Sequence, residues 1–187
     1  MPLTRRTLNW ISITSALALM IVMAPLMNFG FNADAWLLSA RYTARFAFLW
    51  FLVPFLAPRW WSSFNAEDTR DTFLAFAAAH IIHFGALMRY TVVSESSLST
   101  QAVVIGGTAY VLMVGVLVRL LSGKDFPRYA SLILHYILIV FLLTYATRIS
   151  SELTRPVGFV GVGTSVLALI ARHIPRNETS TTDTPPN

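Results

Sequence analysis

Long apolar runs separated by short polar segments dominate the hydrophobic pattern of this chain. A helix crosses the apolar core of a bilayer with roughly 20 residues, and six runs approach that length. They cover approximately residues 8–27, 42–57, 72–90, 102–121, 129–147 and 157–171. The pattern predicts an all-α membrane protein, a bundle of about six transmembrane helices preceded by a short N-terminal segment at residues 1–7.

The polar segments between the runs predict where loops lie and where helices begin. Residues 28–40 (NFGFNADAWLLSA) are expected to form a loop that places Trp36 at the membrane interface. In the charged segment 62–71, Asp68 or Thr69 is positioned to cap the third helix. Residues 174–187 are polar with several prolines, so we expect a disordered tail.

Composition narrows the possible chemistry. Only 12% of the residues are charged, about half the share in soluble domains. Six helices leave no room for a soluble catalytic domain, so nucleotide or flavin chemistry belongs on another polypeptide. Cysteine is absent, which excludes disulfides, iron–sulfur clusters held by thiolates and covalently attached c-type haem.

The net charge of +5 does not indicate nucleic-acid binding, because the basic residues are spread among the helix ends rather than clustered. They predict topology instead. With the N-terminus inside, the inner segments hold nine Lys and Arg residues and the outer segments hold five. The excess on the inner side predicts a multi-pass protein of the inner (cytoplasmic) membrane with both termini cytoplasmic.

Three histidines lie within apolar runs, where an ionisable side chain is costly and usually functional. His80 and His83 share a face of the third helix because they are three residues apart. His135 lies in the fifth run. From the predicted inner ends of the runs, His135, His80 and His83 would lie about 10, 12 and 16 Å deep. Either His80 or His83 is therefore predicted to meet His135 across a shared ligand.

Two interpretations of these histidines stay open. A b-type haem is a flat, largely apolar group whose iron accepts two axial imidazoles, so it fits between parallel helices that carry histidines at similar depth. Alternatively, the chain is a non-enzymatic membrane subunit or small transporter, and its histidines only bridge helices. Basic residues near the helix ends would bind the haem propionates: Arg41, Arg45, Arg89 and Arg148 on the outer side, and Arg70 and Arg128 on the inner side.

A family resemblance favours the haem interpretation. The matching stretches are Ala44-Arg45-Phe46 continuing through FLWFLVPFLAP, then Arg70 with FLAFAAAHIIHF, then a short basic turn before LILHYILIVFLLTY. Across residues 40–150 the chain resembles the ferric reductase-like transmembrane domain family. Within that family it resembles the haem-binding membrane subunits of periplasmic methionine sulfoxide reductase systems.

The resemblance implies six helices, with a b-type haem between histidines of the third and fifth. It favours His83 and His135 as iron ligands, with His80 as an alternative ligand, a quinone contact or a residue that supports the ligand from behind. Related chains commonly carry a second histidine in the fifth helix, where this chain has Arg148, so one haem is expected. The implied function is electron transfer from quinol, or from a separate flavoprotein, to a partner oxidoreductase.

Overall fold

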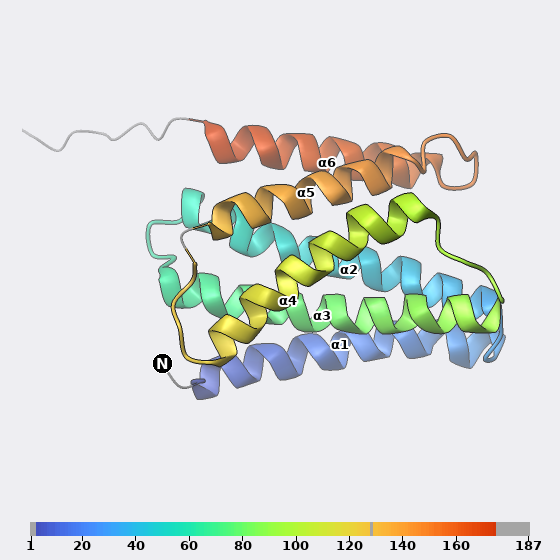
Figure 1. Ribbon diagram of the computed structural model, residues 1–187, viewed down its shortest axis with the longest axis horizontal. Coiled ribbons are helices and arrows are strands. Elements are labelled where there is room, and N and C mark those ends of the chain that lie inside the picture. The colour runs from blue at the N-terminus through green and yellow to red at the C-terminus, as the bar shows by residue number, and fades with distance from the viewer. Residues whose placement is uncertain (1–2, 128, 175–187) are drawn as a thin grey trace, which may run out of the picture.

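The computed structural model describes residues 3–127 and 129–174. Within this part, the secondary structure consists of six α-helices and one π-helical turn, without any strand (Figure 1). The elements are α1 (Arg5–Phe29), α2 (Ala33–Trp60), α3 (Ala66–Val93), the π-helical η1 (Ala102–Gly106), α4 (Gly107–Leu121), α5 (Ala130–Ala146) and α6 (Arg155–His173). The predicted all-α class is confirmed, and most of the predicted disordered tail lies outside the described residues.

Membrane-crossing character is clear for part of the bundle. Among the described residues, four helices are long and apolar enough to cross a membrane by length and composition: α1, α3, the continuous segment Ala102–Leu121, and α6. The apolar α5 has only 17 residues, and α2 is diluted by Arg41, Arg45 and its internal prolines. Six membrane-crossing helices, the inner-membrane location and the cytoplasmic termini stay predictions.

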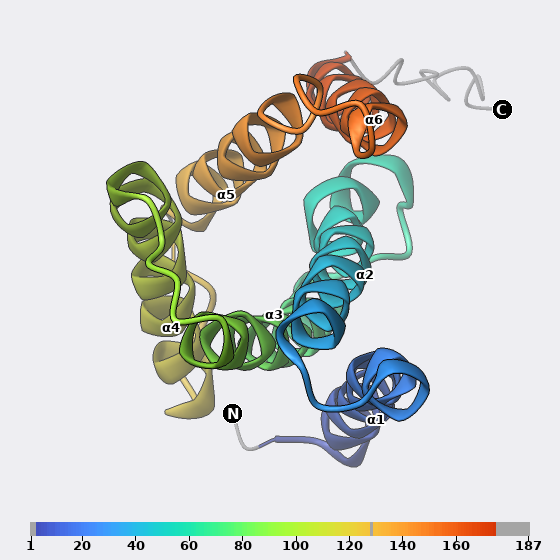
Figure 2. The ribbon, with the colours of Figure 1, turned by 90° about the vertical axis from the view of Figure 1, so that its right-hand side faces the viewer.

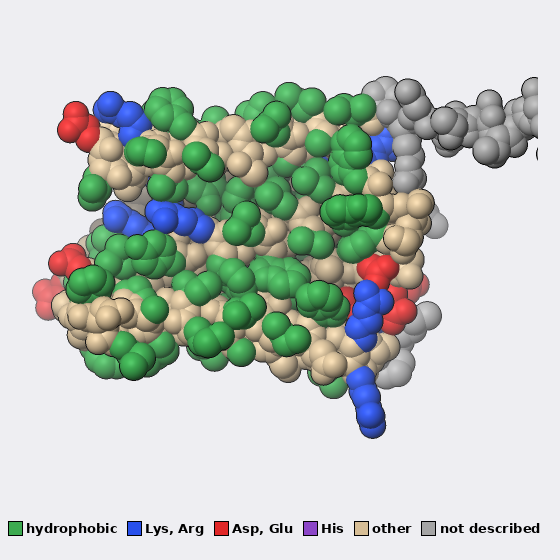
Figure 3. All heavy atoms as spheres, turned by 180° about the vertical axis from the view of Figure 1, so that it is seen from behind, with side chains coloured by type: hydrophobic (Ala, Val, Ile, Leu, Met, Phe, Trp, Pro, Cys, Tyr) green, Lys and Arg blue, Asp and Glu red, His purple; other side chains and the backbone are tan. Residues whose placement is uncertain are grey.

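The helices form a ring with one helix outside it. Seen end-on, α2, α3, α4, α5 and α6 follow one another around the ring, and α1 lies against α2 and α3 (Figure 2). Large apolar side chains are exposed over the outer surface (Figure 3), as expected of helices that face lipid.

Aromatic side chains fill part of the interior of the ring. Phe51, Phe55, Phe73 and Phe76 are fully buried. The ring centroids of Phe51 and Phe76 lie 5.4 Å apart in an edge-to-face arrangement, which is favourable for aromatic pairs. This cluster joins α2 to α3 and provides a rigid base for the neighbouring cavity.

Two helices begin earlier than the apolar pattern predicts. The predicted loop at residues 28–40 is wrong in its second half, because α2 begins at Ala33, where the Asn32 side chain accepts a hydrogen bond from the Ala35 amide at 2.9 Å. The predicted cap of the third helix, Asp68 or Thr69, is also wrong. The cap is Asn65, whose side chain accepts from the Asp68 amide while the Asp68 carboxylate accepts from the Asn65 amide. This reciprocal capping box extends α3 into the charged segment.

A polar network joins the first turns of α1 and α3. Asp71 is fully buried and accepts hydrogen bonds from the Thr7 hydroxyl at 2.8 Å and from Arg70 at 3.2 Å. Arg6 forms an ion pair with Asp68 one turn earlier. Because a buried carboxylate is costly unless it is paired, these contacts fix α1 against α3.

Removing the buried carboxylate should therefore loosen α1. We expect Asp71→Ala to lower the free energy of unfolding by about 3 kcal/mol, since it leaves Arg70 and Thr7 without their shared partner. Thermal unfolding in detergent, followed by circular dichroism, measures the effect. The matched control is Glu67→Ala, which removes a half-exposed partner of Arg70 and should change the stability by less than about 1 kcal/mol. Equal effects of the two substitutions would contradict a clamp centred on Asp71.

The seam between α5 and α6 requires a glycine. A Cβ atom on Gly161 would lie only 2.1 Å from Cγ of Tyr145, and the Tyr145 ring is buried against Phe48 with 5.3 Å between ring centroids. The absence of a side chain at Gly161 therefore leaves room for the Tyr145 ring, which also lines the cavity described below.

We expect Gly161→Ala to destabilise the protein by about 1–3 kcal/mol, because the added methyl group must displace a packed ring. Gly163→Ala is the matched control, since nothing lies within 4 Å of a Cβ there. Melting temperatures of the two variants, compared with the parent protein, measure the difference. A melting temperature for Gly161→Ala at or above that of Gly163→Ala would show that the seam tolerates a larger residue.

Candidate functional site

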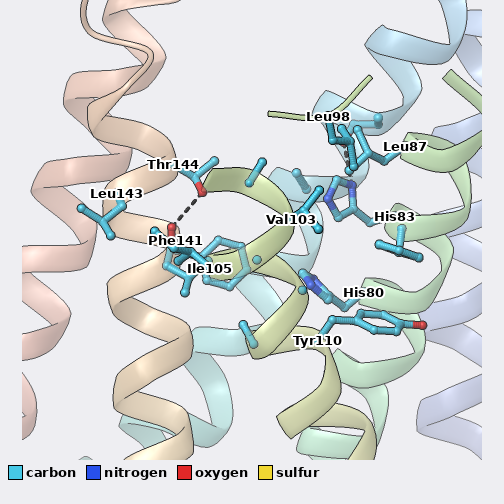
Figure 4. A pocket seen from close by; sticks show the side chains of 18 of the residues that line it. His80, His83, Leu87, Leu98, Val103, Ile105, Tyr110, Phe141, Leu143 and Thr144 are labelled. Atoms are coloured by element: carbon cyan, nitrogen blue, oxygen red, sulfur yellow. Dashed lines mark hydrogen bonds between the residues drawn. The ribbon is translucent and has the colours of Figure 1, made fainter. Parts of the chain in front are cut away.

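A largely apolar cavity of about 700 Å³ lies among α2, α3, η1, α4 and α5. This volume falls within the range of small-molecule and cofactor sites, about 300–1,000 Å³. Phe76 and Phe141 line one end of the cavity and also contact Phe51, with ring centroids 5.4 and 5.6 Å apart. The aromatic cluster is thus the floor of the cavity, and Leu98, from the loop after α3, lines it as well (Figure 4).

His83 lines the cavity, and one of its ring nitrogens is already hydrogen-bonded. Its Nδ1 lies 2.9 Å from the carbonyl oxygen of Ala40 on α2. Since a carbonyl oxygen only accepts, Nδ1 carries the hydrogen and donates it, which leaves the lone pair on Nε2. The same bond fixes the ring orientation, as such bonds do for metal-binding histidines.

His80 lies one turn before His83 and lines the same cavity (Figure 4). The centroids of the two imidazoles are 5.4 Å apart. The Nδ1 atom of His80 is buried and has no hydrogen-bond partner among the described residues. The expectation that the two rings share a face of the third helix is confirmed, and together they provide the polar atoms on the α3 wall.

The structure does not bring His135 to these histidines. The α5 residue that faces His80 is Phe141, with 5.9 Å between ring centroids. Phe141 is six residues after His135, or about 9 Å along the helix. His135 instead contacts Phe55 and His173, at 5.2 and 5.4 Å. The prediction that His135 lies at the depth of His80 or His83 is wrong, because α3 begins at Ala66, six residues before the apolar run. His80 and His83 therefore lie further along the bundle than the apolar run indicates.

Arginines line the other end of the cavity. Arg41 of α2 and Arg148, just after α5, both line it, whereas no acidic residue does so among the described residues. The pKa of the Arg148 guanidinium is lowered, chiefly because burial disfavours its charged form. Tyr145 opposes this shift electrostatically, and the positive charges of Arg45 and Arg41 add to it. Figure 3 shows cationic side chains in a hollow at this end, away from the N-terminal arginines. Such a cluster without carboxylates is suited to an anionic group.

Of the six arginines proposed from sequence as propionate partners, Arg41 and Arg148 line the cavity, Arg45, Arg70 and Arg89 do not, and Arg128 lies outside the described residues. Arg45 lies outside the cavity lining, with its guanidinium carbon 5.3 Å from the Tyr42 ring centre and with a buried Nε that has no partner in the described part of the chain. Arg70 belongs to the network at Asp71, so its role is structural. Sequence reasoning missed the backbone carbonyl of Ala40, which no side-chain pattern signals.

Among the described residues, no group of three or more His, Cys, Asp or Glu side chains is arranged to hold a metal ion. Haem iron sets a smaller requirement, because the porphyrin supplies four nitrogens and the protein only axial ligands.

Comparison of the chain with protein-family models, curated proteins and solved structures finds no match. The resemblance to the ferric reductase-like transmembrane domain family stays a prediction.

Proposed function

We propose that this chain is a membrane protein that binds one b-type haem in the cavity and transfers electrons between separate partners. The observation that supports this most strongly is His83, a buried imidazole with its Nδ1–H bonded to the Ala40 carbonyl, within a cavity of cofactor size. A bound haem would supply one-electron redox chemistry at its iron.

The cavity matches the two chemical halves of a haem. Its apolar lining, with Phe76 and Phe141 at the floor, suits the porphyrin ring. Arg41 and Arg148 would bind the propionates through charge-assisted hydrogen bonds. Because these arginines have no carboxylate partner in the cavity lining, an anionic ligand would relieve their mutual repulsion.

The ligand set that we propose differs from the one predicted from sequence. His83, held in orientation by the Ala40 carbonyl, would bind the haem iron, and His80 is its neighbour in the cavity wall. His135 has no part in the cavity, because Phe141 occupies the α5 position that faces His80. The cavity lining also includes Met113 of α4 and Thr144 of α5.

Electron transfer requires an electron donor and an electron acceptor. We propose quinol or a separate flavoprotein as donor and a partner oxidoreductase as acceptor. The aromatic floor of the cavity would exclude water from the haem, and Arg41 and Arg148 would stabilise the carboxylates of its propionates.

One observation favours the second function, a non-enzymatic membrane subunit or small transporter. The His83 hydrogen bond crosses from α3 to α2, which is what a helix-bridging histidine does. In that case the histidine contributes to packing alone, and a glutamine, which can donate the same hydrogen bond, should replace it.

Absorbance of purified variants separates these functions and tests the ligand assignment. After haem-replete expression, we expect His83→Ala and His83→Gln to lose most of the Soret absorbance, because neither side chain provides an imidazole nitrogen. His135→Ala is the matched histidine control and should keep the haem-to-protein ratio of the parent, because His135 does not line the cavity.

Two outcomes would contradict the assignment. Loss of haem in His135→Ala with retention in His83→Ala would place the ligand on α5. Absence of a Soret band from the parent protein, together with normal folding of His83→Gln, would support the helix-bridging function instead.

The arginine end of the cavity gives a separate prediction. Arg148→Ala should weaken haem binding by about tenfold or more, since a charge-assisted hydrogen bond contributes roughly 1.5–3 kcal/mol. Titration of haem into apoprotein measures the affinity. Arg155→Ala, which changes an exposed arginine after the same turn, is the control and should bind haem as the parent does. Equal affinities for the two variants would exclude Arg148 as a propionate partner.

A further inference from the structure

A second pair of imidazoles lies apart from the cavity. His135 is near the start of α5 and His173 is the last residue of α6, and their ring centroids are 5.4 Å apart. Both helix ends lie at the same end of the bundle as the N-terminus (Figure 1). Neither histidine lines the cavity that holds His80 and His83.

The backbone sets the tautomer of both rings. Nδ1 of His135 lies 2.6 Å from the Ser131 carbonyl oxygen, and Nδ1 of His173 lies 2.8 Å from the Leu169 carbonyl oxygen. Each Nδ1 therefore donates its hydrogen, and each neutral ring keeps its lone pair on Nε2. Two adjacent imidazoles thus have only acceptor nitrogens left for a further partner.

One of these acceptors is buried without a donor. Nε2 of His135 is shielded from solvent and has no hydrogen-bond partner among the described residues. An unsatisfied buried acceptor is unfavourable, and a neutral His173 cannot relieve it, because its own Nε2 also lacks a hydrogen. A cation shared by the two lone pairs would satisfy both nitrogens.

We infer that His135 and His173 bind a zinc-type divalent cation through their Nε2 atoms. Zinc lies about 2.0–2.1 Å from an imidazole nitrogen, so two rings on a tetrahedral ion have centroids about 5 Å apart. The observed 5.4 Å fits that arrangement. Water would complete the coordination, since the described residues place no third His, Cys, Asp or Glu ligand there.

The surroundings set the strength of this site. The edge of Phe55 packs against His135, with centroids 5.2 Å apart, and covers one side of the pair. The Arg172 guanidinium lies on the same Phe55 side chain, 5.6 Å from its ring centroid, and its Nη1 donates to the Phe55 carbonyl at 2.8 Å. Two protein ligands near a guanidinium should give roughly micromolar affinity, weaker than a closed structural site with four ligands.

Metal-dependent thermal stability tests the inference without any assumption about haem. The site would link α5 to α6, so zinc should stabilise the folded protein by mass action. For untagged protein in detergent, we expect zinc at a hundredfold excess over the dissociation constant to raise the melting temperature by roughly 5 °C.

Three variants identify the ligands. His135→Ala and His173→Ala should each abolish the zinc-dependent shift. Leu132→Ala is the control because its side chain is 73% exposed on the same stretch of α5, and it should keep the shift. Cobalt(II) should also give the intense visible absorption of a tetrahedral site in the parent and the control. Absence of a shift in the parent, or a full shift in both histidine variants, would overturn the inference.

Discussion

The hydrogen bond from His83 on α3 to the Ala40 carbonyl on α2 joins the packing of this bundle to the chemistry of its cavity. It depends on a close approach of the two helices, which small residues permit: Ala40 of α2 and Ala86 of α3 are buried in one apolar cluster beside it. The contact fixes an imidazole that would otherwise rotate. It also decides which ring nitrogen remains available, so helix packing determines what the cavity can bind.

The apolar pattern predicted much of the fold, because long apolar runs in a chain with few charges favour helices regardless of tertiary context. It did not predict where α3 begins. The polar residues before the run become helical through the local capping box at Asn65 and the pairing of Asp71 with Arg70 and Thr7. The bond from Thr7 of α1 joins distant parts of the chain. Hydropathy does not encode such contacts.

The candidate site was predictable within one helix but not between helices. His80 and His83 are three residues apart, so helix geometry alone places them on one face, and the structure shows them in one cavity. The level of His135 relative to them depends on how α5 lies against α3, which local sequence does not determine. Phe141, and not His135, is the α5 residue next to His80, and the His135 ring lies beside the His173 ring. Arg148, just after α5, lines the cavity as a cation.

The two histidine pairs lie in different places. His80 and His83 line a cavity that Arg41 and Arg148 also line, and His135 and His173 lie together between α5 and α6. We propose that the cavity holds one b-type haem through a histidine of α3. The haem-to-protein ratio of the untagged wild-type protein, obtained from pyridine haemochrome absorbance and quantitative amino-acid analysis after haem-replete expression, tests it most directly. A ratio near one haem b per chain is predicted, whereas a ratio near zero in folded protein would contradict the claim.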